Sequence, residues 1–169
     1  MDSTALRAMQ APIKERIKND PKAGFITLKA KGSVDGDGIA CKVETGRAIA
    51  TAGLHPATGG SGLELCSGDM LLEALVACAG VTLKSVATAL DIVLKSGTVS
   101  AEGDLDFRGT LGVDKDVPVG FAAIRLTFDI ATDAPQDKVD LLLKLTERYC
   151  VVYQTIRSGP PVAVTLNRA

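Results

Sequence analysis

The side chains of this 169-residue sequence that are most able to do chemistry are four cysteines, Cys41, Cys66, Cys78 and Cys150. A thiolate is a nucleophile and a metal ligand, and two thiols that meet can form a disulfide. No two of the four are spaced as Cys-x-x-Cys, so the spacing supports neither a zinc knuckle nor a thioredoxin-like motif. The cysteines are therefore either small buried apolar side chains or a set in which some members react.

Histidine chemistry is limited to a single residue, because His55 is the one histidine in the sequence. A His-rich metal site is excluded, and a Ser-His-Asp triad would have to use this residue. His55 precedes a glycine-rich loop, where it is either a proton donor to a leaving group or an ordinary hydrogen-bonded residue. Residues 35–38 (DGDG) resemble part of a calcium loop, but the other ligands and the closing Glu are missing, so a hairpin turn is predicted.

Two of the cysteines fall on predicted helices. Cys78 lies in the middle of the most apolar segment, with Leu75 and Thr82 on the same helix face. Cys150 comes late in a second helix, where Lys144 and Arg148 can lower a thiol pKa unless they face the solvent. Taken by themselves, these positions fit a packing role as well as a chemical one.

Composition narrows the class of protein. Apolar residues make up 46% and charged residues 23% of the chain, which is enough for the core of one globular domain. A net charge of -1 and an aromatic content of 4% argue against nucleic acid as a partner. The first residues lack a signal-peptide pattern, and the apolar run 70–83 contains Glu73 and is too short for a membrane span. We therefore expect a cytoplasmic protein that binds neither nucleic acid nor membrane.

The helices and strands that must position these cysteines are predicted from the spacing of apolar residues and from the residues that end helices and strands. Residues 6–18 are predicted to form an amphipathic helix, with Pro12 in its first turn, inside an N-terminal arm of residues 1–21. Extended segments follow at 25–31, 39–43 and 47–52. A dominant helix is predicted over 69–94, capped by Ser67 or Asp69 and ended by residues 95–97.

After that helix, the sequence predicts two long strands, a second helix and a closing strand. The strands cover 98–110 and 121–131, and the helix runs from Pro135 to Tyr149. Pro160 and Pro161 stop further helix, and residues 162–166 are predicted to be a strand. The order indicates an α+β fold in which an antiparallel sheet packs on two helices, one of them long and central.

Two segments in this order resemble one known family. Residues 66–78 read CSGDMLLEALVAC and are similar to Pro-x-Glu-x-Leu-Leu-x-Ala-Leu-x-x-Cys; residues 146–155 read TERYCVVYQT and are similar to Glu/Lys-Arg-x-Cys-Pro-Val. Both motifs belong to the OsmC/Ohr family, the osmotically inducible and organic-hydroperoxide-resistance proteins. The order of elements also resembles this family from about residue 25 to 169, so residues 1–169 are expected to be one OsmC-like domain.

The resemblance implies an activity and an assembly. It implies an intertwined homodimer with the two long helices at its centre, and a thiol peroxidase that needs no metal or organic cofactor. Cys78 would be the peroxidatic thiolate and Cys150 the resolving thiol, with an organic hydroperoxide as substrate and an external dithiol as reductant. The alternative is a non-catalytic member of the fold that binds a ligand or senses redox state.

The departures from the family pattern fall on the groups that would activate the thiolate. The family pairs it with an Arg held by a Glu near the start of the long helix. Here Asp69 stands near that start, either in the Glu role or as a helix cap, and residues 30–34 (AKGSV) contain no Arg. Arg47 is the substitute that the sequence offers. Val151 also stands where the family commonly has Pro.

Overall fold

The computed structural model describes residues 2–19, 31–33, 40–44 and 49–168. The predicted strand over residues 25–31, except its last residue Lys31, lies outside these ranges, as do the DGDG turn and Arg47. The elements in chain order are α1 (Ser3–Asn19), β1 (Lys31–Ser33), β2 (Ala40–Glu44), β3 (Ile49–Gly53), a 3₁₀ turn (Pro56–Thr58), β4 (Leu65–Cys66), α2 (Ser67–Ala89), β5 (Ser96–Leu105), α3 (Phe107–Thr110), β6 (Phe121–Ala131), α4 (Gln136–Tyr149) and α5 (Val151–Ser158).

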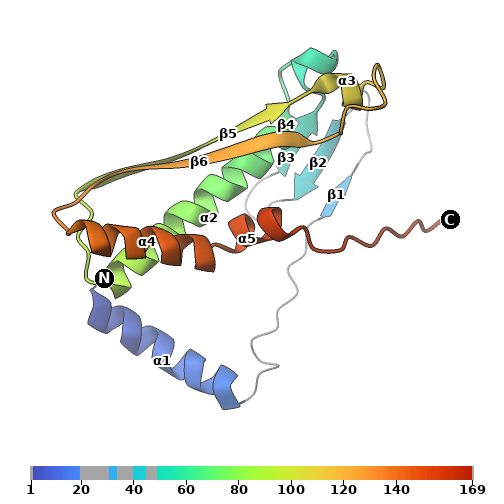
Figure 1. Ribbon diagram of the computed structural model, residues 1–169. Helices are drawn as coiled ribbons and strands as arrows, with labels where there is room; N and C mark the ends of the chain where they lie inside the picture. Colours follow the sequence, from blue (N-terminus) through green and yellow to red (C-terminus); the bar gives the residue numbers. More distant parts are fainter. Residues whose placement is uncertain (1, 20–30, 34–39, 45–48, 169) are drawn as a thin grey trace.

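Helix α2 is the centre of the fold. Figure 1 shows it running beneath the long β5–β6 hairpin, and it also contacts α4 and α5. By length and composition α2 could span a membrane, but in this fold it is the core helix. The cap prediction was wrong, because the helix begins at Ser67 after Cys66, which makes no side-chain capping bond. The predicted end was also too late, since α2 stops at Ala89 and Asp91 turns the chain with a φ of 56°.

The β5–β6 hairpin forms a two-stranded antiparallel sheet. Partly buried side chains alternate with exposed ones along both strands, so one face packs on the helices. Strand β5 ends at Leu105, and the predicted strand residues 107–110 are instead the short helix α3. On the exposed face Arg125 joins Glu102 and Asp104 across the strand pair.

A second sheet has the order β1-β2-β3-β4. Strands β1, β2 and β3 are antiparallel neighbours, whereas β4 pairs parallel to β3 through Ala52–Leu65 and Gly53–Cys66. The α+β class is therefore confirmed, but the described strands make two sheets rather than one. Because β4 runs directly into α2, this sheet fixes where the central helix begins.

The C-terminal part departs most from the sequence prediction. Helix α4 ends at Tyr149 as expected, but Cys150 adopts an extended conformation (φ -73°, ψ 107°) and a new helix, α5, starts at Val151. Gly159, with a φ of 51°, ends α5 in the left-handed conformation that glycine tolerates. The predicted strand at 162–166 is wrong for this chain: these residues pair with no strand in the described structure, and the tail leads away from the body (Figure 1).

The core lies between α2, α4 and the hairpin. Its buried members are Leu83, Val86, Ala87, Ile92 and Leu142. The N-terminal helix packs at the end of α2, with Leu6 buried and the Arg7 guanidinium donating a 3.3 Å hydrogen bond to the Ala89 carbonyl. Pro12 lies inside α1, not in its first turn as predicted. The helical prediction for the arm is otherwise confirmed.

Candidate functional site

Cys78 lies at the border between the buried and the exposed faces of α2. Leu75, one turn before it, is 2% exposed, and Ala79 is completely buried. On the other side of the helix Ala74 and Ala77 are exposed, and Val81 is 72% exposed. Cys78 itself is partly buried. Its sulfur therefore belongs to the core while remaining open to small reactants.

Cys150 is placed by the break between α4 and α5. Its backbone N–H donates to the Thr146 carbonyl (2.9 Å) and its carbonyl accepts from the Gln154 N–H (3.0 Å), so the residue closes one helix and opens the next. The side chain is 1% exposed and makes no capping bond to the first turn of α5. Burial therefore shields this thiol from solvent, whereas Cys78 is accessible.

The structure brings Cys78 and Cys150 close enough together that each thiol shifts the pKa of the other. Burial acts to raise the pKa of Cys78. The backbone of Val152, the Cys150 side chain and the backbone of Val151 together outweigh burial and hold the pKa of Cys78 below the ordinary 9.0. Burial raises the pKa of Cys150 above 9.0, and the Cys78 thiolate beside it opposes its ionisation further. Cys78 is thus the thiol that ionises first.

The groups that stabilise the Cys78 thiolate are not those that the sequence predicted. Within the described ranges, no arginine or lysine is among the causes that lower its pKa. Arg148 and Lys144 are exposed, and the Arg148 guanidinium lies 5.8 Å from the centre of the Tyr149 ring. The favourable groups are backbone N–H groups and hydroxyl and thiol donors, which a search for charged side chains does not find.

Thr82 is a further neighbour of the site, one turn after Cys78 on α2. Its hydroxyl donates a 2.8 Å hydrogen bond to the Cys78 carbonyl. The hydroxyl also acts to lower the pKa of the Cys78 thiol, as the weakest of the four favourable groups. Because the hydroxyl carries one proton, it can donate a hydrogen bond to the Cys78 sulfur only after it rotates away from the carbonyl. We regard it mainly as a backbone partner.

The structure does not bring Asp69 to Cys78 within one chain. The two lie nine positions apart on the same helix, which amounts to about 14 Å along the axis and about two and a half turns, on opposite sides. Asp69 instead lies in the first turn of α2, where its carboxylate faces the positive end of the helix dipole. It lines a separate pocket of about 380 Å³ together with Cys66 and His55.

His55 and the other cysteines are accounted for separately. The Nδ1 atom of His55 accepts a 3.0 Å hydrogen bond from the Ala57 N–H, and its ring stacks on Phe107 at 5.0 Å, as expected of an ordinary loop residue. Cys66 is partly exposed before α2, and Cys41 lies on β2, as predicted. In the described part of the chain, no three His, Cys, Asp or Glu side chains gather as a metal site requires.

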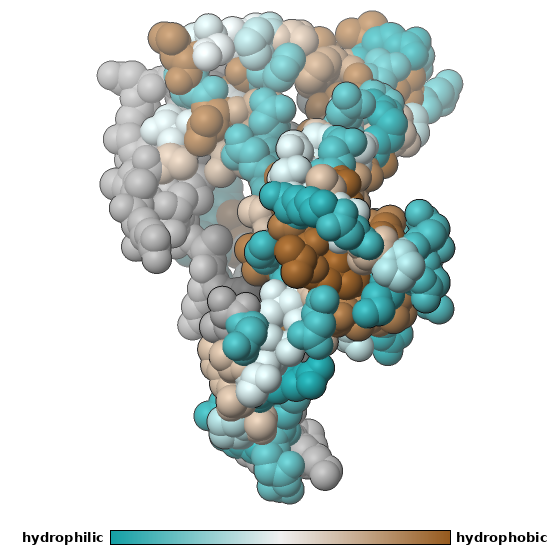
Figure 2. All heavy atoms as spheres, turned by 90° about the vertical axis from the view of Figure 1, so that its left-hand side faces the viewer, coloured by the Kyte–Doolittle hydropathy of each residue, from teal (hydrophilic) through white to brown (hydrophobic). Residues whose placement is uncertain are grey.

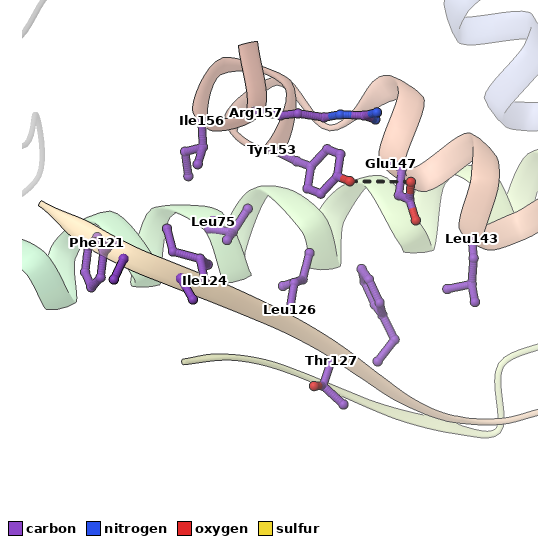
Figure 3. A pocket seen from close by; sticks show the side chains of 13 residues that line it. Leu75, Phe121, Ile124, Leu126, Thr127, Leu143, Glu147, Tyr153, Ile156 and Arg157 are labelled. Carbon is purple, nitrogen blue, oxygen red and sulfur yellow. Dashed lines mark hydrogen bonds between the residues drawn. The ribbon is translucent and has the colours of Figure 1, made fainter. Parts of the chain in front are cut away.

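A pocket of about 820 Å³ lies between β6 and the helices, and Leu75, one helical turn before Cys78, is among its lining residues (Figure 3). Leu75 of α2 and Tyr153 of α5 both line it, so each thiol-bearing segment contributes a wall. The Tyr153 hydroxyl donates a 3.5 Å hydrogen bond to the Glu147 carboxylate at the rim. Cys78 is not among the lining residues, and the pocket approaches it from one helical turn away. The remaining lining residues are mainly apolar: Phe121, Ile124, Leu126, Phe128, Leu143 and Ile156.

Fold and site together define an α+β protein built on one central helix, with two thiols in contact between that helix and the start of a second one. A match to the family model described as "OsmC-like protein" covers residues 59–165, and the chain belongs to this family. The match includes α2 and both cysteines of the site, and it confirms the resemblance that the two motifs indicated.

Solved structures agree with this assignment at the level of the fold. An OsmC-like protein from Mycoplasma pneumoniae matches with a TM-score of 0.64 and 15% identity, over 78% of this chain and 88% of that one. An organic hydroperoxide resistance protein OsmC from Legionella pneumophila matches with a TM-score of 0.60 and 19% identity, over 79% and 90%. The organic hydroperoxide resistance protein OhrB of Bacillus subtilis matches with a TM-score of 0.52 and 19% identity, over 79% and 93%. No curated protein matches the sequence.

Proposed function

We propose that this protein is a two-cysteine thiol peroxidase that reduces organic hydroperoxides. The observation that carries the proposal is the contact between Cys78 and Cys150, with pKa shifts of opposite direction. A peroxidatic cysteine must be ionised and accessible, whereas a resolving cysteine is best kept as a thiol until it is needed. Cys78 is partly exposed and has a lowered pKa, whereas Cys150 is buried and has a raised pKa. Solved structures of similar fold that are named for organic hydroperoxide resistance support the choice of substrate class.

The reaction proceeds in three balanced steps. The Cys78 thiolate attacks one peroxide oxygen, the O–O bond breaks, and the sulfur becomes a sulfenic acid while the alkoxide takes a proton and leaves as an alcohol. The Cys150 thiol then attacks the sulfenic sulfur, which forms the disulfide and releases water. An external dithiol reduces the disulfide by exchange and is itself oxidised to a disulfide.

The surroundings of Cys78 favour an alkyl hydroperoxide over hydrogen peroxide. The apolar pocket beside Leu75 offers a place for an alkyl group, whose transfer from water is favourable in proportion to its apolar area. Hydrogen peroxide gains nothing from such a surface. We expect the preference to appear in KM more than in kcat, because the pocket binds the part of the substrate that does not react.

A homodimer in the cytoplasm is part of the same proposal. The outer face of α2 presents Leu71, Ala74, Ala77 and Val81 at helical spacing, and all four are exposed in the single chain. On the face that Figure 2 draws, apolar side chains gather between hydrophilic ones. Exposed apolar surface of this kind is typical of protein that packs against a partner. A second copy laid on α2 would close the open side of Cys78.

A redox sensor is the second candidate, and one observation favours it. No cationic side chain in the described residues stabilises the Cys78 thiolate, so its reaction with peroxide would be slower than in a site with an arginine. A sensor needs the same disulfide but no rapid turnover. The two functions therefore differ in rate and in recycling, not in the bond formed.

The experiment that tests the proposal is intact mass spectrometry of the reduced protein before and after one equivalent of an alkyl hydroperoxide. The expected product has lost two hydrogen atoms, and peptide mapping assigns the loss to a Cys78–Cys150 disulfide. Steady-state turnover with an excess of dithiol then separates a peroxidase from a sensor. An unchanged mass, or scattered oxidation at Cys41 and Cys66, would refute both functions.

Two serine variants give the matched controls. C78S is expected to lose all turnover, because a hydroxyl does not ionise at neutral pH and does not attack peroxide. C66S removes another partly exposed thiol that lies in a different pocket, and it is expected to keep the activity of the parent protein. Equal losses in the two variants would contradict the assignment of Cys78.

A further inference from the structure

Two cavities share Glu147 and Arg157 as lining residues. The first is the apolar pocket of about 820 Å³ described above, and Figure 3 shows both side chains coming from the helices that line it. The second, of about 630 Å³, is lined by side chains of α4 and α5 on either side of the break between these helices. Because the same two side chains line both cavities, the cavities adjoin, and one elongated ligand can extend from the first into the second.

The two cavities differ in charge. In the apolar pocket the charged lining side chains are Glu147 and Arg157, whose charges cancel. The second cavity adds Lys144 and Arg148, so that three cations and one carboxylate give it a net charge of +2. The joined space therefore has an apolar end without net charge and a polar end that favours an anion.

The cations of the second cavity are available to a ligand. Lys144, Arg148 and Arg157 are exposed, and none of them belongs to an ion pair among the residues that the structure describes. The ion pairs there use other cations: Arg7, Lys95, Arg108 and Arg125. The Glu147 carboxylate accepts the 3.5 Å hydrogen bond from the Tyr153 hydroxyl. An anion that enters this cavity therefore displaces no carboxylate from these cations.

Helix ends account for two of the three cations. Arg148 and Arg157 lie in the last turns of α4 and α5, where a cation faces the negative end of the helix dipole. Lys144 lies one turn earlier on α4, where the dipole has little effect because it falls off within the last turn. Lys144 is thus the cation whose removal tests the ligand and not the helix.

We propose that the two cavities form one binding site for an amphiphile with a single alkyl or acyl chain and a phosphate monoester head. The chain lies in the apolar pocket, where its burial is favourable in proportion to its apolar area. The phosphate lies among Lys144, Arg148 and Arg157, because ammonium and guanidinium groups are strong partners of phosphate. A phosphate monoester carries nearly two negative charges at neutral pH, which matches the second cavity better than the single charge of a carboxylate.

Isothermal titration calorimetry with decyl phosphate at pH 8, below the concentration at which it forms micelles, tests the site. We expect saturable binding of one molecule per chain. Octyl phosphate should bind about tenfold more weakly, because two methylene groups fewer are buried. Decanoate, which has the shorter charge, should bind about threefold more weakly than decyl phosphate, and decanol more weakly still. Equal affinity of octyl and decyl phosphate would refute the chain site, and equal affinity of decanoate and decyl phosphate would refute the phosphate site.

Substitutions on the surface of α4 and α5 give matched variants. R157Q is expected to bind decyl phosphate about fivefold more weakly and K144Q about threefold more weakly, because each removes one exposed cation from the head site. K138Q is the control, since Lys138 is also exposed on α4 but lines neither cavity. All three side chains are exposed, so the variants are expected to fold. Unchanged binding in R157Q and K144Q, or equal losses in K144Q and K138Q, would overturn the proposal.

Methyl NMR of the parent protein locates the chain. Ile124 of β6 and Ile156 of α5 line the apolar pocket, whereas Val81 lies on the exposed outer face of α2. Decyl phosphate is expected to shift the methyl signals of Ile124 and Ile156 and to leave those of Val81 in place. Shifts at Val81 without shifts at the two isoleucines would show adsorption to the exposed face of α2 and would refute the site.

Decyl phosphate carries no peroxide, so this proposal and the peroxidase function can fail separately. Saturable binding by a protein without hydroperoxide turnover would refute the peroxidase and keep the binding site. Conversely, turnover of an alkyl hydroperoxide without saturable binding of decyl phosphate would keep the peroxidase and refute the binding site. When both hold, decyl phosphate is expected to raise the KM for the hydroperoxide and to leave kcat unchanged, because both chains occupy the same apolar pocket.

Discussion

Replacing Cys150 by alanine is the perturbation that separates the two halves of the proposed cycle. The variant keeps Cys78, so attack on the hydroperoxide remains available. It removes the thiol that converts the sulfenic acid into a disulfide. With one equivalent of hydroperoxide and no dithiol, we expect C150A to give a product that is one oxygen atom heavier, whereas the parent protein gives a disulfide that is two hydrogen atoms lighter.

The magnitude of the other effects follows from the geometry. Cys150 is 1% exposed, so the loss of its sulfur costs about 1 kcal/mol of the free energy of unfolding, similar to a buried methylene group. This loss is small beside the roughly 5–15 kcal/mol by which native domains are typically stable, so we expect the variant to stay folded. The loss of the Cys150 thiol also removes one of the donors to Cys78, so the pKa of Cys78 should rise and the first attack should slow at pH values below the ordinary 9.0.

The assay is rapid-quench mass spectrometry with one and with five equivalents of hydroperoxide, at two pH values. Failure of C150A to give the product that is one oxygen atom heavier at Cys78, when no dithiol is present, would refute the assignment of Cys150 as the resolving thiol. A first attack that is faster at low pH in C150A than in the parent protein would refute the donor role of its thiol. C66A serves as the matched control, because it also removes one cysteine sulfur but leaves the pair intact.

Two further predictions concern the helix and the core. In D69N we expect the pH profile of Cys78 alkylation to be unchanged, since Asp69 lies on the far side of α2. Urea unfolding should show a loss of about 0.5 kcal/mol, because the variant removes a favourable interaction with the helix dipole. A shifted alkylation profile would show that Asp69 acts on Cys78. In L142A, with Leu142 completely buried, urea unfolding should show a loss of about 3 kcal/mol, against well under 1 kcal/mol in L141A, where the side chain is 42% exposed. Similar losses in both would contradict the core described for α4.

Periodicity predicted most of the fold because the elements bury one regular face. The central helix, strand β6 and helix α4 all appear where their patterns indicated, with boundaries shifted by a few residues. The end of α2 was placed too late because apolar residues continue past Ala89 into the connection, where Leu90, Ile92 and Leu94 still pack on the core. An apolar pattern alone does not show where a helix turns into a packed loop.

The C-terminal errors have a different cause. Residues 151–158 were not predicted as a helix because the segment is short and follows an extended residue, so its stability comes from packing on α2 and not from propensity. Residues 162–166 alternate in the way that a strand does, yet a strand needs a neighbour. Within one chain nothing in the described structure pairs with them, and Val162, Val164 and Leu166 are exposed.

The two cysteines of the site were predictable from the sequence, whereas the groups around them were not. The two motifs predicted that Cys78 and Cys150 belong together, and the structure places them in contact. The activating groups were sought among charged side chains, because the family pattern has them there, whereas the pKa of Cys78 is lowered mainly by the backbone of Val152 and Val151 and by the Cys150 side chain. Backbone donors carry no sequence signature of their own.

The contact between two cysteines that are 72 positions apart in the sequence has a consequence for the stability of the whole domain. A disulfide there would tie α2 to the start of α5 and close a loop that contains the hairpin and α4. Closing a loop of this length removes enough entropy from the unfolded chain to stabilise the fold by about 4 kcal/mol. By linkage the same free energy makes the folded disulfide harder to reduce. Each oxidation would therefore tighten the domain and each reduction loosen it, so that resistance to heat and to proteases would report the redox state of the cell.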